Sequence, residues 1–537
     1  MRQQTKVLLV YPRFAGPSFW NFRETCSLVG ARYPAPPLGL ITVAAMLPDH
    51  WTLRLVDCNV EELSDRDLGW ADLVLMSGML PQQENALRLI DRVHAAGKLV
   101  AVGGPDATSS PELYAAADFR VLGEAEDVID DFIAAWTSGE TKGDFTAPKF
   151  QADVTRSPVP RFDLLTFSNY LFVGVQFSRG CPFTCEFCDI IELYGRVPRT
   201  KTTEQMLAEL DALYALGYRG HVDFVDDNLI GNKKAVKAFL PALIEWQKAH
   251  SHPFEFSTEA SINLADDQAL LALLSQAGFF TVFVGIESPD EDVLRSAQKK
   301  QNTRRDIVVS LEKIYAAGIV VIAGFILGFD DEKPGAGARM AELIEDAAIP
   351  VSMVGLLYAL PNTQLTTRLG REGRLFASDH VEEGVSGDQC IAGLNFDTKR
   401  PRIDILRDYH QVVSSIYTPR SFFDRVRRVG EKLRPPPSVD KSFNFGRSMA
   451  DARLFTRFMV KSAFRHPQLA LQMTRLIGQG MRTNPGAVPA MVKMAIFYAH
   501  LGPFARYVSE EIASQIEAIE DGSWAAPERT PAIVMTA

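Results

Sequence analysis

The feature that most limits what this chain can fold into is a repeated alternation of short apolar segments with helical stretches. Segments that alternate in this way favour parallel strands, because each helix carries the chain back across the sheet. In the N-terminal part, where residues 84–96 are one helical stretch, the expected strands are residues 6–11, 51–57, 71–77, 99–103 and 119–123. The sequence therefore predicts an α/β multidomain protein whose residues 1–150 form a doubly wound, Rossmann-like sheet.

A second series of the same kind occupies residues 165–375, with helical stretches at 203–216 and 233–249. Its expected strands are residues 171–177, 221–225, 254–258, 281–286, 320–326 and 352–358. Six strand–helix units fit a partial (β/α)6 barrel, in which chemistry takes place at the C-terminal strand ends. Residues 140–165 are rich in Gly, Pro and polar side chains and are predicted to link the two sheets. The strand pattern is lost over residues 399–537, and residues 376–537 are predicted to form a mostly helical domain.

Residues 181–188 read CPFTCEFC and space three thiols as C-x3-C-x2-C. Three thiolates on one tight loop can hold three irons of a [4Fe–4S] cluster and leave the fourth iron open. The alternatives are a zinc knuckle or three buried thiols, but a structural zinc site needs four ligands and no second cysteine pair is present. A cluster is therefore favoured, with Cys181, Cys185 and Cys188 as ligands. The other three cysteines are interpreted as small buried hydrophobes; they are Cys26, Cys58 and Cys390.

With this spacing the chain resembles the radical S-adenosylmethionine (SAM) enzymes. The resemblance implies that SAM binds the open iron and is cleaved by an electron from the cluster. Asp226, Asp227 and Asn228 stand where many members have Gly-Gly-Glu, which contacts the SAM amino group, and the departure leaves open which of the three makes this contact. Three cations after the cluster loop either orient an anionic group or lie on a solvated loop; they are Arg196, Arg199 and Lys201.

Further SAM contacts are expected at the ends of the later strands, where acidic side chains can pair with the amino group and ribose hydroxyls of SAM. The resemblance implies ribose or methionine contacts at Glu259 and Glu287, and adenine packing along residues 324–328. Each acid has a plain structural alternative as a helix N-cap or a solvated loop end. The remaining candidates for SAM contacts are Ser288, Gly324 and Pro361.

The first sheet resembles the cobalamin-binding domain found upstream of many radical SAM domains. Ligands of such sheets sit at the C-terminal strand ends, where glycines let a large flat ligand approach the backbone. The Asp-x-His-x-x-Gly motif that supplies a histidine to cobalt is absent, so no histidine ligand is expected. The alternative is a degenerate flavodoxin-like domain without a ligand. The candidate contacts are Tyr11, Asp57, Ser77, Met79, Gly103, Gly104, Pro105, Gly123 and Glu124.

Stretches such as PPLGL, WADLVLMSGM, FVDDNLIGN and LPNTQLTTRLGREGRL make the chain similar to a cobalamin-binding radical SAM branch that includes hopanoid C-2 methylases. The resemblance implies a methyltransferase that acts on an unactivated carbon of a hopanoid, another isoprenoid lipid or a natural product, with a [4Fe–4S] cluster, SAM and cobalamin as cofactors. A reductant such as flavodoxin or ferredoxin would supply electrons. The alternatives are a non-methylating radical SAM cyclase, coupling enzyme or oxidoreductase, and an iron–sulfur sensor without catalysis.

The C-terminal region is basic, with 19 Lys and Arg against 6 Asp and Glu in residues 399–493. Four cations recur every four residues in 449–466, next to bulky apolar side chains; they are Arg453, Arg457, Lys461 and Arg465. This pattern fits either a peripheral contact with an anionic membrane or an ordinary packing helix with a basic face. No nucleic-acid-binding module accompanies the charge. Without a signal peptide or a spanning segment, we expect a cytoplasmic protein that can also lie at the inner membrane surface.

Overall fold

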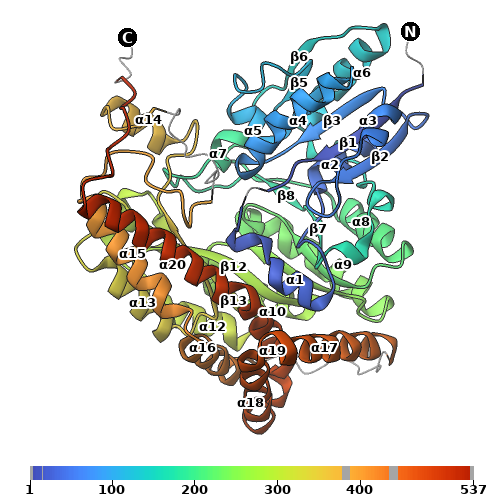
Figure 1. Cartoon of the computed structure of the whole chain (residues 1–537). Helices are drawn as coiled ribbons and strands as arrows, with labels where there is room; N and C mark the ends of the chain where they lie inside the picture. Colours follow the sequence, from blue (N-terminus) through green and yellow to red (C-terminus); the bar gives the residue numbers. More distant parts are fainter. Residues whose placement is uncertain (1–3, 15, 378–387, 435–444, 532–537) are drawn as a thin grey trace.

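The computed structural model describes residues 4–14, 16–377, 388–434 and 445–531, with backbone only for residues 445–454. Two six-stranded parallel sheets and a group of C-terminal helices make up the molecule (Figure 1). This arrangement confirms the predicted fold class. In the described residues no helix is both long enough and apolar enough to cross a bilayer.

The first sheet has the strand order β2-β1-β3-β4-β5-β6, and all of its pairs are parallel. Alternate residues of its central strands point to opposite faces, so each face has a separate apolar core covered by helices. Its strands are β1 (Lys6–Tyr11), β2 (Thr52–Asp57), β3 (Leu73–Ser77), β4 (Leu99–Gly103), β5 (Phe119–Leu122) and β6 (Gly143–Thr146). Its helices are α2 (Leu38–Met46), α3 (Asp65–Trp70), α4 (Gln83–Ala95), α5 (Gly104–Ser109) and α6 (Ile129–Ser138).

Strand β6 was not among the five strands predicted for the first sheet. Residues 143–146 pair with β5 at the edge of the first sheet. The sequence GDFT carries too few apolar side chains to show a strand, because an edge strand buries only part of its surface. The remainder of the segment runs from this edge to the second sheet.

The second sheet has the order β14-β13-β12-β11-β10-β7, with parallel pairing throughout. Its first and last strands do not pair, so it remains an open partial barrel as predicted. Its strands are β7 (Val173–Val175), β10 (Gly220–Phe224), β11 (Phe254–Glu259), β12 (Phe279–Glu287), β13 (Val320–Leu327) and β14 (Val351–Leu356). Its helices are α7 (Ile190–Leu193), α8 (Thr203–Ala215), α9 (Lys233–Ala249), α10 (Gln268–Ala277), α11 (Glu291–Ser296), α12 (Ile307–Ala316), α13 (Ala336–Asp346) and α14 (Gln364–Arg371).

The C-terminal region is helical, as predicted, and packs along one side of the second sheet (Figure 1). Helix α15 lies between α13 and α20, and α16 packs against α18 and α19. The helices are α15 (Arg402–Ile416), α16 (Pro419–Lys432), α17 (Phe445–Arg465), α18 (Pro467–Thr483), α19 (Val488–Ile496) and α20 (Tyr498–Glu520).

A short helix from the N-terminal part, α1 (Arg23–Val29), leaves the first sheet and packs against α17 and α20 (Figure 1). Lys461 donates to the carbonyl oxygen of Ser27 at 2.8 Å, and Arg465 donates to its Oγ at 3.3 Å. Cations at the C-terminal end of α1 complement the partial negative charge of that helix end. The described cations of the basic face of α17 thus pack on α1. This favours an ordinary packing helix over a membrane contact for this face. The side chain of Arg453 lies outside the described residues.

Candidate active site

The three cysteines lie on one loop that begins at the second sheet. An antiparallel pair, β8 (Ser178–Arg179) with β9 (Arg199–Thr200), holds the base of this loop. Gly180 has a φ of +93°, and a Cβ there would lie 2.9 Å from the carbonyl oxygen of Gly195. The N–H of Cys181 donates to that same oxygen at 3.2 Å. The loop therefore requires glycine immediately before its first cysteine.

Amide donors surround the thiols. The Nδ2 of Asn228 lies 3.9 Å from the Sγ of Cys181, and the Nε2 of Gln301 lies 3.6 Å from the Sγ of Cys185. Burial raises the pKa of the Cys181 and Cys188 thiols, so iron binding would release their protons. In the described residues no three His, Cys, Asp or Glu side chains surround a single ion position, and a cubane does not require this because its thiolates bind different irons. Three thiols on one loop with amide donors to sulfur fit a [4Fe–4S] cluster.

Asp226 is buried and holds the backbone in front of the cluster loop. Its carboxylate accepts hydrogen bonds from the N–H of Phe177 at 3.0 Å and the Oγ of Ser178 at 2.6 Å, and also from the N–H of Ser178. Burial raises the pKa of Asp226 to about 7. With both oxygens engaged by protein donors, Asp226 is placed to position β7 and β8 rather than to meet a ligand.

The next two residues also brace the segments around the cysteines. One oxygen of Asp227 accepts the N–H of Gly180 at 3.0 Å. Asn228 accepts the N–H of Ser261 through its Oδ1 at 3.1 Å, besides its contact with Cys181. Of the three residues at this strand end, Asp227 keeps the most acceptor capacity for a ligand.

Glu259 contrasts with Asp226. It is exposed at the end of β11, and its carboxylate makes no hydrogen bond or ion pair with the described residues. Desolvation within the mouth of the sheet, together with the negative charges of Asp223, Asp227 and Asp226, raises the pKa of Glu259 to about 8. An unpartnered carboxyl group among other carboxylates is available to a cationic ligand.

Glu287 ends β12 with its backbone in the left-handed region, at a φ of +67°, where the pairing with β13 shifts register. Its Oε1 pairs with the Nζ of Lys299 at 2.6 Å, and a Cβ on Gly285 would lie only 2.3 Å from that oxygen. Glycine at 285 thus makes room for a buried ion pair. The following residue, Ser288, accepts the N–H of Asp290 at 3.1 Å and supports the start of α11.

The structure also contains a polar chain that sequence reasoning missed. The Nε2 of His221 lies 2.5 Å from the Oγ of Ser257, which in turn donates to Asp223. These residues lie on β10 and β11, and their alternate spacing along two neighbouring strands is the signal that could have revealed them. Two of the predicted SAM contacts lie apart from these three polar residues. Gly324 packs on the ring of Phe283, and Pro361 lies in the loop after β14.

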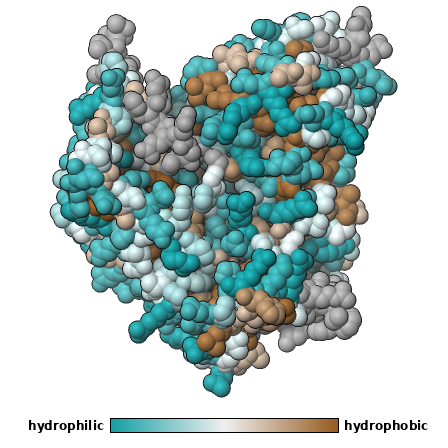
Figure 2. Space-filling model, in the orientation of Figure 1, coloured by the Kyte–Doolittle hydropathy of each residue, from teal (hydrophilic) through white to brown (hydrophobic). Residues whose placement is uncertain are grey.

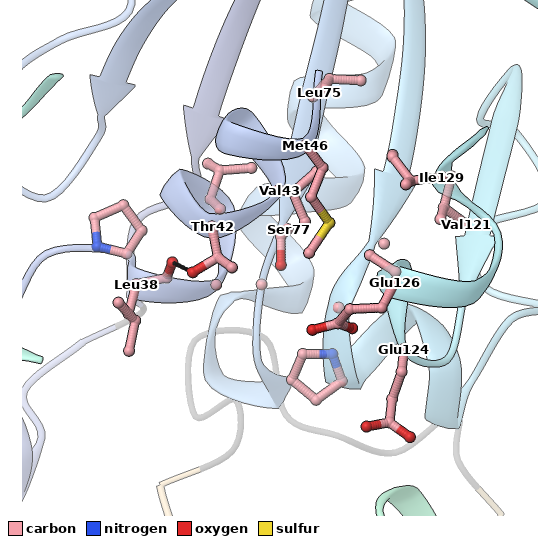
Figure 3. A pocket seen from close by; sticks show the side chains of 18 of the residues that line it. Leu38, Thr42, Val43, Met46, Leu75, Ser77, Val121, Glu124, Glu126 and Ile129 are labelled. Carbon is pink, nitrogen blue, oxygen red and sulfur yellow. Dashed lines mark hydrogen bonds between the residues drawn. The ribbon is translucent and has the colours of Figure 1, made fainter. Parts of the chain in front are cut away.

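A cavity of about 380 Å³ opens at the C-terminal end of the first sheet and extends to residues of the second (Figure 3). Figure 3 shows apolar side chains, among them Val43, Met46 and Ile129, toward one end, and the carboxylates of Glu124 and Glu126 toward the other. Eight of the nine residues proposed for cobalamin line this cavity: Tyr11, Ser77, Met79, Gly103, Gly104, Pro105, Gly123 and Glu124.

The glycines of this cavity provide the close approach that a large flat cofactor needs. Gly104 has a φ of +88°, and a Cβ there would lie 2.2 Å from the Oγ of Ser77. A Cβ on Gly103 would lie 2.8 Å from the carbonyl oxygen of Val121. An apolar cleft beside an exposed glycine backbone fits the flat rings of cobalamin. Sequence reasoning missed helix α2 as one wall of the cavity, although its first residues belong to the PPLGL stretch.

Asp57 does not line this cavity. It is buried, accepts the Asn59 N–H at 2.9 Å and accepts the Oη of Tyr170 at 3.0 Å, so it ties the first sheet to the chain entering the second. Two of the three cations after the cluster loop are also used internally: Arg199 pairs with Glu124, and Lys201 with Glu209. Only Arg196 is exposed among the three.

A second cavity, of about 320 Å³, adjoins the first at Gly123 and Glu124. It lies between the first sheet, helix α7 after the cysteines and the loop after β14, and its lining includes Asp189 and Pro361. Asn362 spans this junction and donates to the carbonyl oxygen of Ser109 at 2.7 Å. The second cavity therefore lies between the glycine-rich cleft and helix α7, which follows the cysteines.

Comparison with known proteins finds three family models, each on a different part of the chain. Family models match at residues 26–133 (B12 binding domain), 175–344 (Radical SAM superfamily) and 363–514 (Domain of unknown function, DUF4070). An uncharacterized methyltransferase of Synechocystis sp. is 43% identical over 95% of this chain and 94% of its own length. The hopanoid C-2 methylase of Rhodopseudomonas palustris is 40% identical over 72% of this chain and 75% of its own.

A solved structure of the cobalamin-dependent SAM radical enzyme OxsB, with aqua-cobalamin and SAM bound, is similar in fold with a TM-score of 0.59. It is 15% identical over 98% of this chain and 82% of its own. The three-thiol loop on a partial barrel, next to a B12-binding sheet, defines a radical SAM protein with a cobalamin domain. The chain belongs to the family of cobalamin-dependent radical SAM methyltransferases, whose cofactors are a [4Fe–4S] cluster, SAM and cobalamin.

Proposed function

We propose that this protein methylates an unactivated carbon of a hopanoid or a related isoprenoid lipid. The similarity to a hopanoid C-2 methylase over three quarters of that relative's length supports this substrate class. The observation that carries the proposal is the glycine-rich cleft of the first sheet together with the second cavity, which shares Gly123 and Glu124 with it and lies beside helix α7. When bound, the cluster supplies the electron that cleaves SAM, and cobalamin supplies the methyl group.

Different residues of the chain would bind the cluster, SAM and cobalamin. We propose that Cys181, Cys185 and Cys188 ligate the cluster and that Glu259 and Asp227 receive the cationic end of SAM, because both keep free carboxylate oxygens. Glu287, held by Lys299, would meet the ribose or methionine part. In the first sheet, Ser77 and the backbone at Gly103, Gly104 and Gly123 would line the cobalamin cleft.

Products of SAM turnover test the proposal. The anaerobically reconstituted, cobalamin-loaded protein would be incubated with SAM, a strong reductant and a hopanoid-containing lipid extract, with a Cys185→Ala control. We expect 5′-deoxyadenosine and S-adenosylhomocysteine together, and a lipid heavier by one methylene. Cluster-dependent 5′-deoxyadenosine without S-adenosylhomocysteine would instead indicate a non-methylating enzyme.

We also propose that the end of the molecule formed by α17 and α18 contacts an anionic membrane, which would bring the enzyme to its lipid. Phe464 is 87% exposed, Val460 lies one turn before it on α17, and Leu471 and Met481 are exposed on α18. Figure 2 shows apolar side chains gathered in this region. Residues 452–509 contain eight Lys and Arg and no Asp or Glu. Lys461 and Arg465 contact α1 and Lys493 pairs with Glu255, whereas Arg475 and Arg482 are exposed on α18. Each cation near an anionic surface contributes about 1 kcal/mol to binding.

Cosedimentation with vesicles of phosphatidylglycerol or of phosphatidylcholine alone tests this contact. We expect binding to the anionic vesicles only, with a loss on raising the salt concentration. The Phe464→Ser variant should bind at least about tenfold more weakly, since it removes a large exposed apolar side chain. Leu113→Ser, at an exposed apolar position of the first domain, is the matched control. Equal binding to both kinds of vesicle would contradict an electrostatic contact.

A further inference from the structure

Four charged side chains form a buried group where the first sheet meets the cysteine loop. Glu124 and Glu126 follow β5 of the first sheet, whereas Arg179 and Arg199 come from β8 and β9. All four side chains are between 2% and 16% exposed. We call them the junction charges.

The contacts among the junction charges are short and directional. Arg179 binds both oxygens of Glu126, at 2.7 and 2.9 Å, and reaches Glu124 at 3.3 Å. Arg199 binds the other oxygen of Glu124 at 2.7 Å. Two acids therefore face two cations, and the group is neutral as a whole. Such two-point pairing fixes orientation as well as distance.

The connecting segment between the sheets joins the same group. Ser157 donates to Glu126, and Arg199 donates to the carbonyl oxygen of Ala152 at 2.9 Å. The Nε of Arg179 donates to Gln176 at 2.8 Å, which extends the group to the end of β7. The group thus joins the first sheet, the connecting segment and the strand before the cysteines.

The position of the junction charges relates them to both cofactor sites. Arg179 stands two residues before Cys181 in the chain. Glu124 lines both cavities, and Arg179 and Glu126 line the first. The paired arginine and the Ser157 hydroxyl outweigh burial and lower the pKa of Glu126 to about 2, so this carboxylate stays charged across the neutral range.

Buried charges of this kind tolerate little displacement, because a cation and an acid that separate inside the protein each lose their partner without gaining water. A shift of the first sheet relative to the cysteine loop would break both pairs of Arg179 together. The arrangement consequently favours one relative position of the two domains over neighbouring ones.

We propose that the junction charges are positioning residues that fix the cobalamin domain against the cysteine loop and thereby set the separation of the two cofactors. This inference rests on the cofactors of the family and not on the lipid substrate. The acids act through the two arginines and contact no reacting atom in this role.

Electron paramagnetic resonance of the reconstituted holoenzyme tests the proposal without a substrate. Reduction with dithionite gives a paramagnetic cluster next to cob(II)alamin, and the magnetic interaction between them reports their separation. In Glu126→Gln and Arg179→Lys we expect a weaker or heterogeneous interaction, with iron and cobalamin contents as in the unaltered protein. With substrate present, the ratio of 5′-deoxyadenosine to S-adenosylhomocysteine should rise by about fivefold, because cleavage of SAM becomes uncoupled from methyl transfer.

The matched control is Asp144→Asn, which breaks the bidentate pair of Asp144 with Arg120 inside the first domain. It should leave the spin interaction and the product ratio unchanged. The combined variant Glu126→Gln with Arg179→Lys should differ little from either single change, since all three break the same pairing. An unchanged spin interaction in both single variants overturns the proposal. Loss of iron from Glu126→Gln overturns it as well, because the ion pair would then serve to fold the cysteine loop. If Arg179→Lys fails to fold, the iron content and spin interaction of Glu126→Gln alone still test the proposal.

Discussion

At the C-terminal strand ends of the second sheet, whether a carboxylate can bind a ligand depends on how many hydrogen bonds it already accepts from the protein. Asp226 accepts three hydrogen bonds from the segment before the cysteine loop, whereas Glu259 accepts none from the described residues. Two acids at neighbouring strand ends are therefore suited to different tasks. The first shapes the loop and the second is free to meet a charged ligand.

Replacing these acids by their amides should separate the two tasks. We expect Glu259→Gln to weaken SAM binding by about tenfold, because the cationic end of SAM would favour the ionised form of Glu259 and a charged hydrogen-bond partner contributes roughly 1.5–3 kcal/mol. Iron loading should stay unchanged. Asp226→Asn should lower iron loading, because its amide would turn an N–H group toward the backbone donors of Phe177 and Ser178. Isothermal titration with SAM and iron analysis measure the two effects. Equal SAM affinity in Glu259→Gln would refute the assigned contact.

Removal of a single thiol tests the cluster directly. Cys185→Ala should lose the visible absorption and the iron of the reconstituted protein, because the remaining two thiols cannot complete the set of three. Cys58→Ala is the matched control, since Cys58 is a buried cysteine at the end of β2. It should keep full iron content and cost only about 1 kcal/mol of stability.

At the scale of secondary-structure elements, the contact between the N-terminal segment and α20 depends on pH. His500 is buried against Phe22 and Phe504 and lies 2.9 Å from the carbonyl oxygen of Ser18. Burial lowers the pKa of His500 to about 4. Between pH 4 and about 6.5 the unfolded chain therefore binds a proton that the folded protein does not. The buried, uncharged His500 therefore makes its full contribution to the free energy of unfolding above pH 6.5. This contribution is lost as the pH falls toward 4.

The variant His500→Gln should reduce this acid sensitivity. Thermal unfolding between pH 7 and pH 5 should show a smaller loss of stability in the variant, by up to about 2 kcal/mol. Part of the slope should remain, because burial also lowers the pKa of His221 to about 4. His50→Gln, at an exposed position, is the control. An unchanged slope in His500→Gln would show that this contact does not govern acid unfolding.

Some of the secondary-structure elements and their contacts could be predicted from the sequence, and others could not. Central strands such as β1 and β4 carry continuous apolar runs, and their bounds match the expected ones. Strand β6 was missed because GDFT has one large apolar side chain, and only its pairing with β5 makes it a strand. The cation spacing of α17 was visible, but its partner α1 lies more than 400 residues away in the chain. Which strand-end acid is free, as with Glu259, depends on donors from other strands that no local pattern shows.

At the scale of the whole molecule, cobalamin should stabilise the first domain by binding only its folded state. Gly104→Ala should abolish the rise in melting temperature on addition of hydroxocobalamin, because the new methyl group would collide with the Oγ of Ser77. Gly97→Ala is the matched control: its φ is also positive, at +68°, but a Cβ there meets nothing within 4 Å. Backbone strain should cost each variant about 1 kcal/mol of stability, and Gly104→Ala should lose more because of the collision. Only Gly97→Ala should keep the cobalamin response. A retained response in Gly104→Ala would contradict the placement of the cofactor.

The packing of α1 against the C-terminal helices has a consequence for how the protein is made. Thr25 bonds to the carbonyl oxygen of Ile496, and Ser18 to His500, across 471 and 482 residues of chain. At about 5–20 residues per second, a ribosome synthesises these partners tens of seconds after the first sheet has left the exit tunnel. During that interval α1 has no docking surface, and its apolar side must be shielded by other means. Docking of α1 therefore has to wait until α17 and α20 have been synthesised.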